Sequence, residues 1–315
     1  MGNYYNPYEG IAGVNGRWMK CNFHIHSEVG KLPTETIFEY YKDAEYDILM
    51  HSSQKQFEDT GKIGEKLGIK TYNGQEYIRY DGILLVGIHE MIGGEPQEAI
   101  DKCIEEGGFA IINHPNQAEV KVEGVPLPPV FPKDILYSLR RAVGVEIYNG
   151  CLSRRNFFGG QRVGWGIGTD FWDDQLSKGI LFWGFANDDS HQPFEINVGW
   201  THIFADSTSL EDVKRAVKKG NLYASNGLYL HDYSFDGKLI RVTADFQYDR
   251  IKKIHYKFIG QNGAILAEQD GESGSYILRG DEMYVRVEAM APDGDMLWTQ
   301  PIVNKNRFKD ENGIF

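Results

Sequence analysis

The stretch Asn22-Phe23-His24-Ile25-His26 decides how the rest of the chain is interpreted. It follows residues 17–21, a mixed segment typical of a β-strand. Side chains alternate between the two faces of a strand, so His24 and His26 are expected on one face and Phe23 and Ile25 on the other. Two imidazoles on one face at the end of a buried strand are suited to holding a divalent metal. Such a site needs further ligands, each at the end of its own strand.

Composition places the chain among ordinary globular proteins. Its residues are 41% hydrophobic and 25% charged. At 315 residues the chain is long enough for one large domain and a smaller one, or for two medium domains. The 45 acidic residues outnumber the 33 basic ones, for a net charge of −12. This balance argues against nucleic acid or an anionic membrane as a partner.

Cysteine usage and the first residues bear on the compartment. Cys21, Cys103 and Cys151 form no CxxC pair, which favours a reducing environment. Residues 1–7 lack the basic start and apolar run of a signal peptide, and the longest apolar runs have the length of a strand. We therefore expect a soluble, cytoplasmic protein.

Strands and helices alternate along the first two thirds of the chain, which predicts a parallel sheet or barrel. Further strands are expected at residues 47–50, 69–76, 82–88, 109–115, 143–149, 180–186 and 200–205. Helices are expected at residues 32–46, 55–68, 95–107, 135–142, 171–178 and 210–220, the last capped by Ser209 or Thr208.

Candidate metal ligands recur where the expected strands end: His24, His26, His51, Glu76, His114, Asp189 and His191. Parallel α/β barrels gather their active sites at this edge. Burying such groups without partners would cost roughly 2–7 kcal/mol each, and metal coordination removes that cost. The remaining histidines are expected to be structural: His89, His202, His231 and His255.

The character of the sequence changes after residue 227. Short alternating runs are separated by turn signals such as Asp236-Gly237, Asp270-Gly271 and Asp293-Gly294, with no helical pattern of any length. We expect a metal-binding domain over residues 1–227 and a small all-β sandwich over residues 228–315.

The ordered set of motifs resembles the PHP family, the polymerase and histidinol phosphatase metal-dependent phosphoesterases. The motifs are His24-x-His26, His51, Gly74-Gln75-Glu76, His114-Pro115, Glu146-x-x-Asn149 and Asp189-x-His191. The resemblance covers nearly the whole chain, including the β-sandwich that follows the barrel in a two-domain branch. It implies an α/β fold, with a distorted (β/α)7 barrel of the PHP type and then the sandwich.

The same resemblance implies one to three divalent ions, Zn, Mn or Fe. Ligands of a first metal are matched by His24, His26, Glu76 and Asp189. Glu76 would bridge to a second metal that His114 also binds, while His51 and His191 match ligands of a third. Glu76, His114 and His191 are implied as catalytic residues, with hydroxide held between metals attacking phosphorus.

Three positions depart from the family pattern. Met50 stands where an acidic ligand is usual, and Asp81-Gly82-Ile83 replaces a segment that usually contains a histidine. The acidic turn after the first motif is shortened to residues 27–30, where Glu28 could compensate. These departures predict a reduced metal complement.

The predicted activity is hydrolysis of a small phosphate ester, either a phosphomonoester or a small phosphodiester. Arg154 or Arg155 is the favoured phosphate-binding residue, and Glu146 is expected to orient a ligand imidazole. Asn149 is expected either to bind substrate or to support a metal ligand. The alternative is a degenerate relative that binds a metal and a phosphorylated or carbohydrate ligand with little or no turnover.

Overall fold

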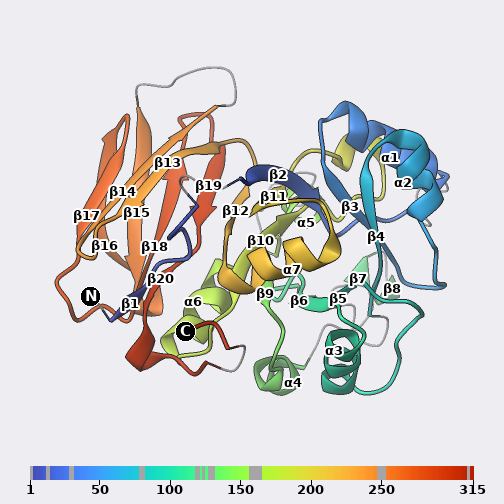
Figure 1. Cartoon of the computed structure of the whole chain (residues 1–315), viewed down its shortest axis with the longest axis horizontal. Helices are drawn as coiled ribbons and strands as arrows, with labels where there is room; N and C mark the ends of the chain where they lie inside the picture. The colour runs from blue at the N-terminus through green and yellow to red at the C-terminus, as the bar shows by residue number, and fades with distance from the viewer. Residues whose placement is uncertain are drawn as a thin grey trace.

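The computed structural model describes residues 3–11, 15–27, 32–77, 82–117, 121–122, 125–126, 132–155, 165–246, 253–310 and 313–315. At 121–122, 125–126 and 154–155 the description covers the backbone alone. The chain forms a mixed α/β structure with a large sheet and a small antiparallel sheet of three strands (Figure 1).

Seven strands of the large sheet lie side by side and carry most of the predicted site. In sheet order they are β2 (Arg17–Asn22), β3 (Ile48–Ser53), β4 (Lys70–Glu76), β5 (Ile83–Val86), β6 (Phe109–Ile112), β9 (Gly144–Asn149) and β10 (Trp183–Asn187). Strands β2, β3 and β4 are parallel to one another, as are β6, β9 and β10.

Strand β5 is antiparallel to both of its neighbours, β4 and β6, so the expected all-parallel arrangement is wrong at this point. A parallel connection needs about a dozen residues for its crossover. Residues 77–82 are too few for such a crossover, which agrees with the antiparallel pairing of β5 with β4. The sheet is therefore mixed.

Helices pack on this sheet through their apolar faces. They are α1 (Thr34–Asp43), α2 (Gly61–Leu67), α3 (Pro96–Glu105), α4 (Lys133–Ser138), α5 (Gly150–Arg155), α6 (Thr169–Ser177) and α7 (Leu210–Lys219). Ile100 of α3, Trp172 of α6 and Val217 of α7 all lie in the main hydrophobic core. Helices α1 and α2 lie beside β3 and β4, at the end of the molecule opposite the C-terminal strands (Figure 1).

The large sheet continues beyond β2 into the C-terminal part of the chain. Its further strands are β11 (Trp200–Ala205), β12 (Leu222–Ser225), β19 (Met296–Thr299), β18 (Tyr284–Met290), β20 (Ile302–Asn304) and β1 (Tyr4–Tyr5). Strand β15 (Ile254–Gly260) pairs with β18 and with β16 (Ala264–Gly271). The division of the chain at residues 227 and 228 remains a prediction, because hydrogen-bonded strands run across it.

The small sheet contains β13 (Tyr229–Phe235), β14 (Leu239–Asp245) and β17 (Gly274–Ile277). It shares one hydrophobic cluster with the end of the large sheet, in which Val242 of β14 meets Tyr256 of β15 and Val287 of β18. The described residues after α7 contain strands and two short 3₁₀ turns, η2 (Gln261–Gly263) and η3 (Lys305–Arg307). A separate hairpin joins β7 (Lys121–Val122) to β8 (Val125–Pro126).

The strand pairings among the described residues form an open path from β2 to β10 and show no closed barrel. One isolated parallel bridge links the two ends of this path, between Ile25 after β2 and Ser190 after β10. The N–H of His26 donates to the Ser190 carbonyl at 2.8 Å. The polypeptide segments that carry the first and last predicted motifs are therefore in direct contact.

Candidate metal centre

His24 and His26 lie just after β2, on backbone that is hydrogen-bonded to β3 on one side and to the segment after β10 on the other. Ile25 between them donates its N–H to Ser52 Oγ at 3.0 Å and accepts from Ser52 N at 2.9 Å. The two histidines are buried, and their ring centroids are 5.1 Å apart. The predicted alternation therefore brings both imidazoles to one place.

Glu76, the last residue of β4, connects three imidazoles. Its Oε1 lies 3.3 Å from His24 Nε2 and 3.0 Å from His114 Nε2, and its Oε2 lies 3.2 Å from His26 Nε2. His114 follows β6 by two residues. Three strand ends thus supply one carboxylate and three ring nitrogens to a single buried cluster.

Asp189 approaches the same two histidines from β10. Its Oδ1 lies 3.2 Å from His24 Nε2 and 3.3 Å from His26 Nε2. His191 is close by, with its ring stacked on that of His26 at 4.6 Å between centroids. Asp189 and His114 have φ values of +52° and +26°, in a region that residues other than glycine rarely adopt. Such backbone strain is concentrated at functional sites.

Glu146 of β9 fixes the orientation of the cluster. Its Oε1 lies 3.1 Å from His24 Nδ1, and its Oε2 accepts from His114 N at 3.0 Å and from Asn149 Nδ2 at 2.8 Å. Because the carboxylate accepts, His24 Nδ1 carries a proton, and His24 Nε2 is the nitrogen that can bind either a metal ion or a second proton. Asn149 Nδ2 also donates to Asp189 Oδ2 at 3.2 Å.

His24 Nε2 is a buried nitrogen that makes no hydrogen bond, although two carboxylate oxygens lie within 3.3 Å of it. A lone pair facing two anions requires a cation between them, either a proton or a metal ion. Burial opposes protonation of His24, but Asp189, Glu76 and Glu146 outweigh it and raise the pKa of His24 well above its usual value. For Glu76 the directions are reversed. Burial would raise the pKa of this carboxyl group, but the neighbouring His24, His114 and His26 lower it well below its usual range.

The donor set fits a divalent metal. Three overlapping groups place one ligand atom from each member within 4.8 Å of the others: His24, His114 and Asp189; His24, His26 and Glu76; and His26, Asp189 and His191. Imidazole and carboxylate donors together suit Zn, Mn or Fe. The buried His/Asp/Glu clusters could therefore bind metal ions, whose identity the ligand types leave open.

His51 is predicted as a ligand, but the structure places it in a different network. Its Nε2 lies 2.9 Å from Ser27 Oγ, and its Nδ1 lies 2.9 Å from Glu58 Oε2. Thr34 Oγ1 completes a closed hydrogen-bond network, because it lies 3.1 Å from Ser27 Oγ and 2.8 Å from Glu58 Oε2. Among the described residues His51 belongs to none of the metal-compatible groups. Its role as a ligand remains a prediction.

The departures from the family pattern have structural counterparts. Met50 is fully buried in the main core, next to Gly74, so its side chain fills apolar space. Ile83 is buried in the same core, and His89 is exposed. Glu28 and Asp81 lie outside the described residues, as do the side chains of Arg154 and Arg155.

The structure also brings in residues that the sequence pattern did not single out. Asn113 Nδ2 lies 2.5 Å from Glu76 Oε1 and 2.9 Å from His114 Nε2. Cys151 and Glu195 lie beside His191, and the three form a fourth metal-compatible group. The sequence offered one indication of these residues, which is their nearness to predicted ligands. Asn113 directly precedes His114, and Glu195 follows His191 by four residues.

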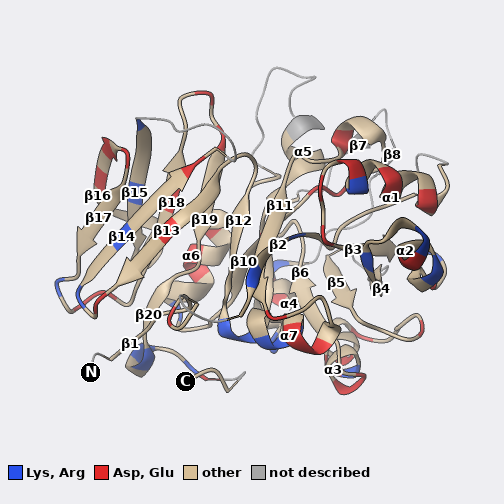
Figure 2. Ribbon diagram, turned by 45° about the horizontal axis from the view of Figure 1, so that its top comes forward, with Lys and Arg blue, Asp and Glu red and all other residues tan. Residues whose placement is uncertain are grey.

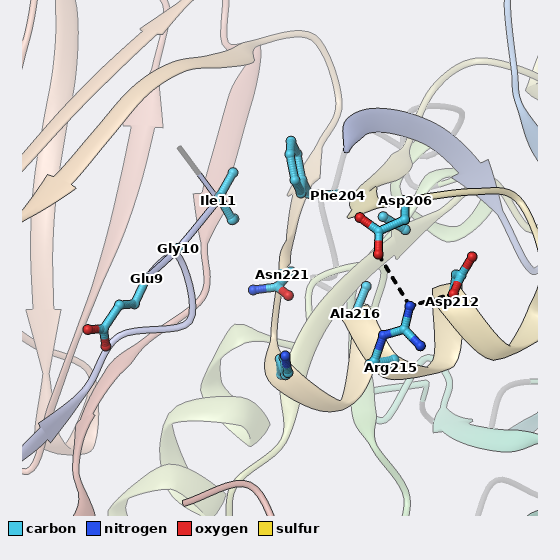
Figure 3. Close-up of a pocket in the computed structure, with 11 residues that line it drawn as sticks. Glu9, Gly10, Ile11, Phe204, Asp206, Asp212, Arg215, Ala216 and Asn221 are labelled. Atoms are coloured by element: carbon cyan, nitrogen blue, oxygen red, sulfur yellow. Dashed lines mark hydrogen bonds and ion pairs between the residues drawn. The ribbon is translucent and has the colours of Figure 1, made fainter. Parts of the chain in front are cut away.

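A pocket of about 260 Å³ lies elsewhere, between the N-terminal segment and α7. Phe204, Arg215 and Asn221 line it, and none of the metal-compatible residues does (Figure 3). Arg215 forms ion pairs there with Asp206 and Asp212.

The buried His202 was expected to be structural, and its contacts lie away from the metal-compatible residues. Its Nδ1 accepts a hydrogen bond from Trp200 Nε1 at 3.2 Å, and burial lowers its pKa to about 3.

Fold and site together define a mixed α/β protein with buried His/Asp/Glu clusters that could hold metal. No protein-family model matches the sequence, and a search of curated proteins finds no match either. In the part of the chain that is described, no helix is both long and apolar enough to cross a membrane.

Proposed function

We propose that this chain is a metal-dependent hydrolase of a small phosphate ester. The observation that carries the proposal is Glu76, a buried carboxylate in contact with His24, His26 and His114. Asp189 adds a second carboxylate to the same nitrogens. Imidazole-rich sites with a shared carboxylate are a recurring way to hold the paired divalent ions used in phosphoester hydrolysis.

We also propose the finer architecture that the family resemblance implies. Strands β2 to β10 would form a distorted (β/α)7 barrel of the PHP type, with the Ile25–Ser190 bridge supporting closure between its first and last strands. Residues 1–227 would form this domain, and residues 228–315 a β-sandwich built on the cluster that joins β14 to β15 and β18.

Each residue of the centre has a role in this proposal. A bound divalent ion would polarise the phosphoryl oxygens and lower the pKa of an attacking water. Glu146 keeps the proton on His24 Nδ1, so Nε2 would be available to hold an ion. His191 has the most exposed side chain of the predicted ligands, at 15%, and in this proposal it would meet a substrate at the solvent side. Glu76, His114 and His191 remain the proposed catalytic residues.

A second candidate function is binding of a phosphorylated or carbohydrate ligand with little or no turnover. Two observations favour it: Met50 packs into the core, and His51 is engaged by Ser27 and Glu58. Together they reduce the donors available for a third ion.

Loading the purified protein with Mn²⁺ or Zn²⁺ and assaying p-nitrophenyl phosphate separates the two. The hydrolase proposal expects turnover that falls at least 100-fold in Glu76→Ala and His114→Ala, in parallel with bound metal, while His89→Ala matches wild type. Bound metal without turnover over a broad phosphoester panel would support the binding protein. Absence of metal under every loading condition would contradict both.

A further inference from the structure

We propose that Cys151, His191 and Glu195 form a further metal position, with a thiolate ligand, for a borderline or soft divalent ion such as Zn²⁺, Co²⁺ or Cd²⁺. The position adjoins the proposed hydrolase centre and shares only His191 with it. It lies where α5 begins, against the 3₁₀ turn η1 (Pro193–Glu195) that follows β10.

The Cys151 thiol lies close to tetrahedral donor spacing from His191 and from Glu195. Cys151 Sγ lies 3.9 Å from His191 Nδ1 and 3.5 Å from Glu195 Oε1, and His191 Nδ1 lies 3.8 Å from Glu195 Oε2. Bond lengths of about 2.3 Å to sulfur and about 2.0–2.2 Å to nitrogen or oxygen place tetrahedral donors roughly 3.3–3.7 Å apart. The two Cys151 Sγ distances lie within a few tenths of an ångström of this range, and all three donor atoms lie within 4.8 Å of one another.

The backbone around the three residues already fixes two of the donors. Glu195 Oε2 accepts from His191 N at 2.7 Å and from Gln192 N at 3.0 Å, which leaves Oε1 directed at the thiol. Cys151 N donates to the Asp188 carbonyl at 2.7 Å. Such outer hydrogen bonds orient metal ligands and contribute to affinity.

Charge favours a divalent ion at this position. On metal binding the Cys151 thiol would release its proton to solvent. The resulting thiolate and the Glu195 carboxylate would carry two negative charges in a buried setting, and one divalent cation neutralises both. His191 Nδ1 also lies 2.8 Å from the Asp189 carbonyl, so the ion would take the place of the proton that Nδ1 shares with that oxygen. Sulfur and imidazole donors select Zn²⁺, Co²⁺ or Cd²⁺ over Mg²⁺ or Ca²⁺.

The other two cysteines have a different environment and provide matched controls. Cys21 and Cys103 are buried in the main hydrophobic core, where their thiols contact backbone carbonyls. Burial raises the pKa of Cys103 to about 12, and it raises the pKa of Cys21 as well. Neither belongs to a metal-compatible group among the described residues.

Titration of the metal-free full-length protein with Co²⁺, followed by absorption spectroscopy, tests this position directly. A thiolate ligand produces a sulfur-to-cobalt charge-transfer band in the near ultraviolet. We expect the band in wild type, in Cys21→Ser and in Cys103→Ser, and its loss in Cys151→Ser. Glu195→Gln should weaken Co²⁺ binding at this band at least tenfold, which tests the site without removing the thiol.

Glu76→Ala separates this proposal from the hydrolase, because it alters the His/Asp/Glu centre and leaves all three ligands of the thiolate position in place. The band should survive in Glu76→Ala even where turnover and metal content at the main centre are lost. Absence of the band in wild type at saturating Co²⁺, or its persistence in Cys151→Ser, would overturn the thiolate position and leave the hydrolase proposal standing.

Discussion

At the scale of single residues, Glu146 organises its neighbours through four donors. Its two carboxylate oxygens lie against His24 Nδ1, Asn187 Nδ2, His114 N and Asn149 Nδ2. It thus sets the tautomer of one imidazole and the backbone position of another. The centre is held in place by a residue that belongs to none of the metal-compatible groups.

Glu146→Gln tests this role. An amide NH₂ would face two of the four donors, so the orientation of His24 should be lost. We expect metal affinity at the His/Asp/Glu centre to fall about 10–100-fold, as is usual when a group that orients a metal ligand is removed. Competition with a chelator measures this, with Glu39→Gln on the exposed face of α1 as the control. Equal affinity in Glu146→Gln and wild type would show that Glu146 does not orient the ligands.

Residue types and their order were enough to predict most members of the cluster. His24, His26, Glu76, His114, Asp189 and His191 each follow or end a strand, and the structure brings them together. The position of His51 was less predictable, because Glu58 lies on an irregular segment whose path the sequence does not specify. The partners of His191 depend on how α5 and η1 meet, which has no local signal.

At the scale of elements, α7 shows how local sequence sets both helix ends. Ser209 Oγ accepts from Asp212 N at 3.2 Å, and Gly220 ends the helix with φ of +73°. Glu211 and Asp212 lie in the first turn, and Lys218 and Lys219 in the last, which complements the helix dipole. The acidic and basic ends of α7 are visible as red and blue segments (Figure 2). Of the two caps that the sequence allows, the structure selects Ser209.

Ser209→Ala should lower the free energy of unfolding by about 1 kcal/mol, within the range of about 0.5–2 kcal/mol for loss of an N-cap. Thr208→Ala, one residue earlier, is the matched control and should change it by less than about 0.5 kcal/mol. Urea denaturation of the two variants gives both values. A larger loss in Thr208→Ala than in Ser209→Ala would reverse the assignment of the cap.

Strong periodicity predicted the existence of most elements, and their boundaries were less certain. The strand at residues 200–205 was predicted with its observed limits, whereas α2 begins at Gly61 instead of residue 55. Helix α5 was not predicted, because its six residues carry too little pattern. The direction of β5 depends on the length of a connection rather than on its apolar sequence.

At the scale of the whole molecule, a buried ion pair connects the α/β part to the C-terminal strands. Arg286 of β18 donates to Asp173 of α6 through Nε at 2.8 Å and Nη2 at 2.6 Å. Arg286 also contacts Glu288 at 2.7 Å and lies over the Trp172 ring at 5.0 Å. Its side chain is 2% exposed, so the pair is shielded from solvent.

Removing one partner of this pair should destabilise the protein strongly. Arg286→Met leaves Asp173 buried without its cation, and we expect a loss of about 3–5 kcal/mol in the free energy of unfolding. The exposed pair of Lys102 and Glu90 is the control, and Lys102→Met should cost no more than about 1 kcal/mol. Denaturant titrations measure both, and similar losses in the two variants would mean that the buried pair does not stabilise the junction.

The arrangement of the two parts was the least predictable feature. The change in sequence character after residue 227 predicted a β domain, and the described residues of this part contain strands and two short 3₁₀ turns. The pairing of β12 with β19, and of β1 with β20, joins residues far apart in the chain. Such pairings depend on shape and register between distant segments, which alternation within one strand does not encode.

Metal content is the most direct measurement of the central claim. Purified protein is loaded with Zn²⁺ or Mn²⁺, desalted and analysed by elemental mass spectrometry, together with Glu76→Ala and the exposed control His89→Ala. The account predicts at least one ion per chain in wild type and in His89→Ala, and a loss of more than half of it in Glu76→Ala. Wild-type protein that retains no metal, or Glu76→Ala that retains all of it, would contradict the account.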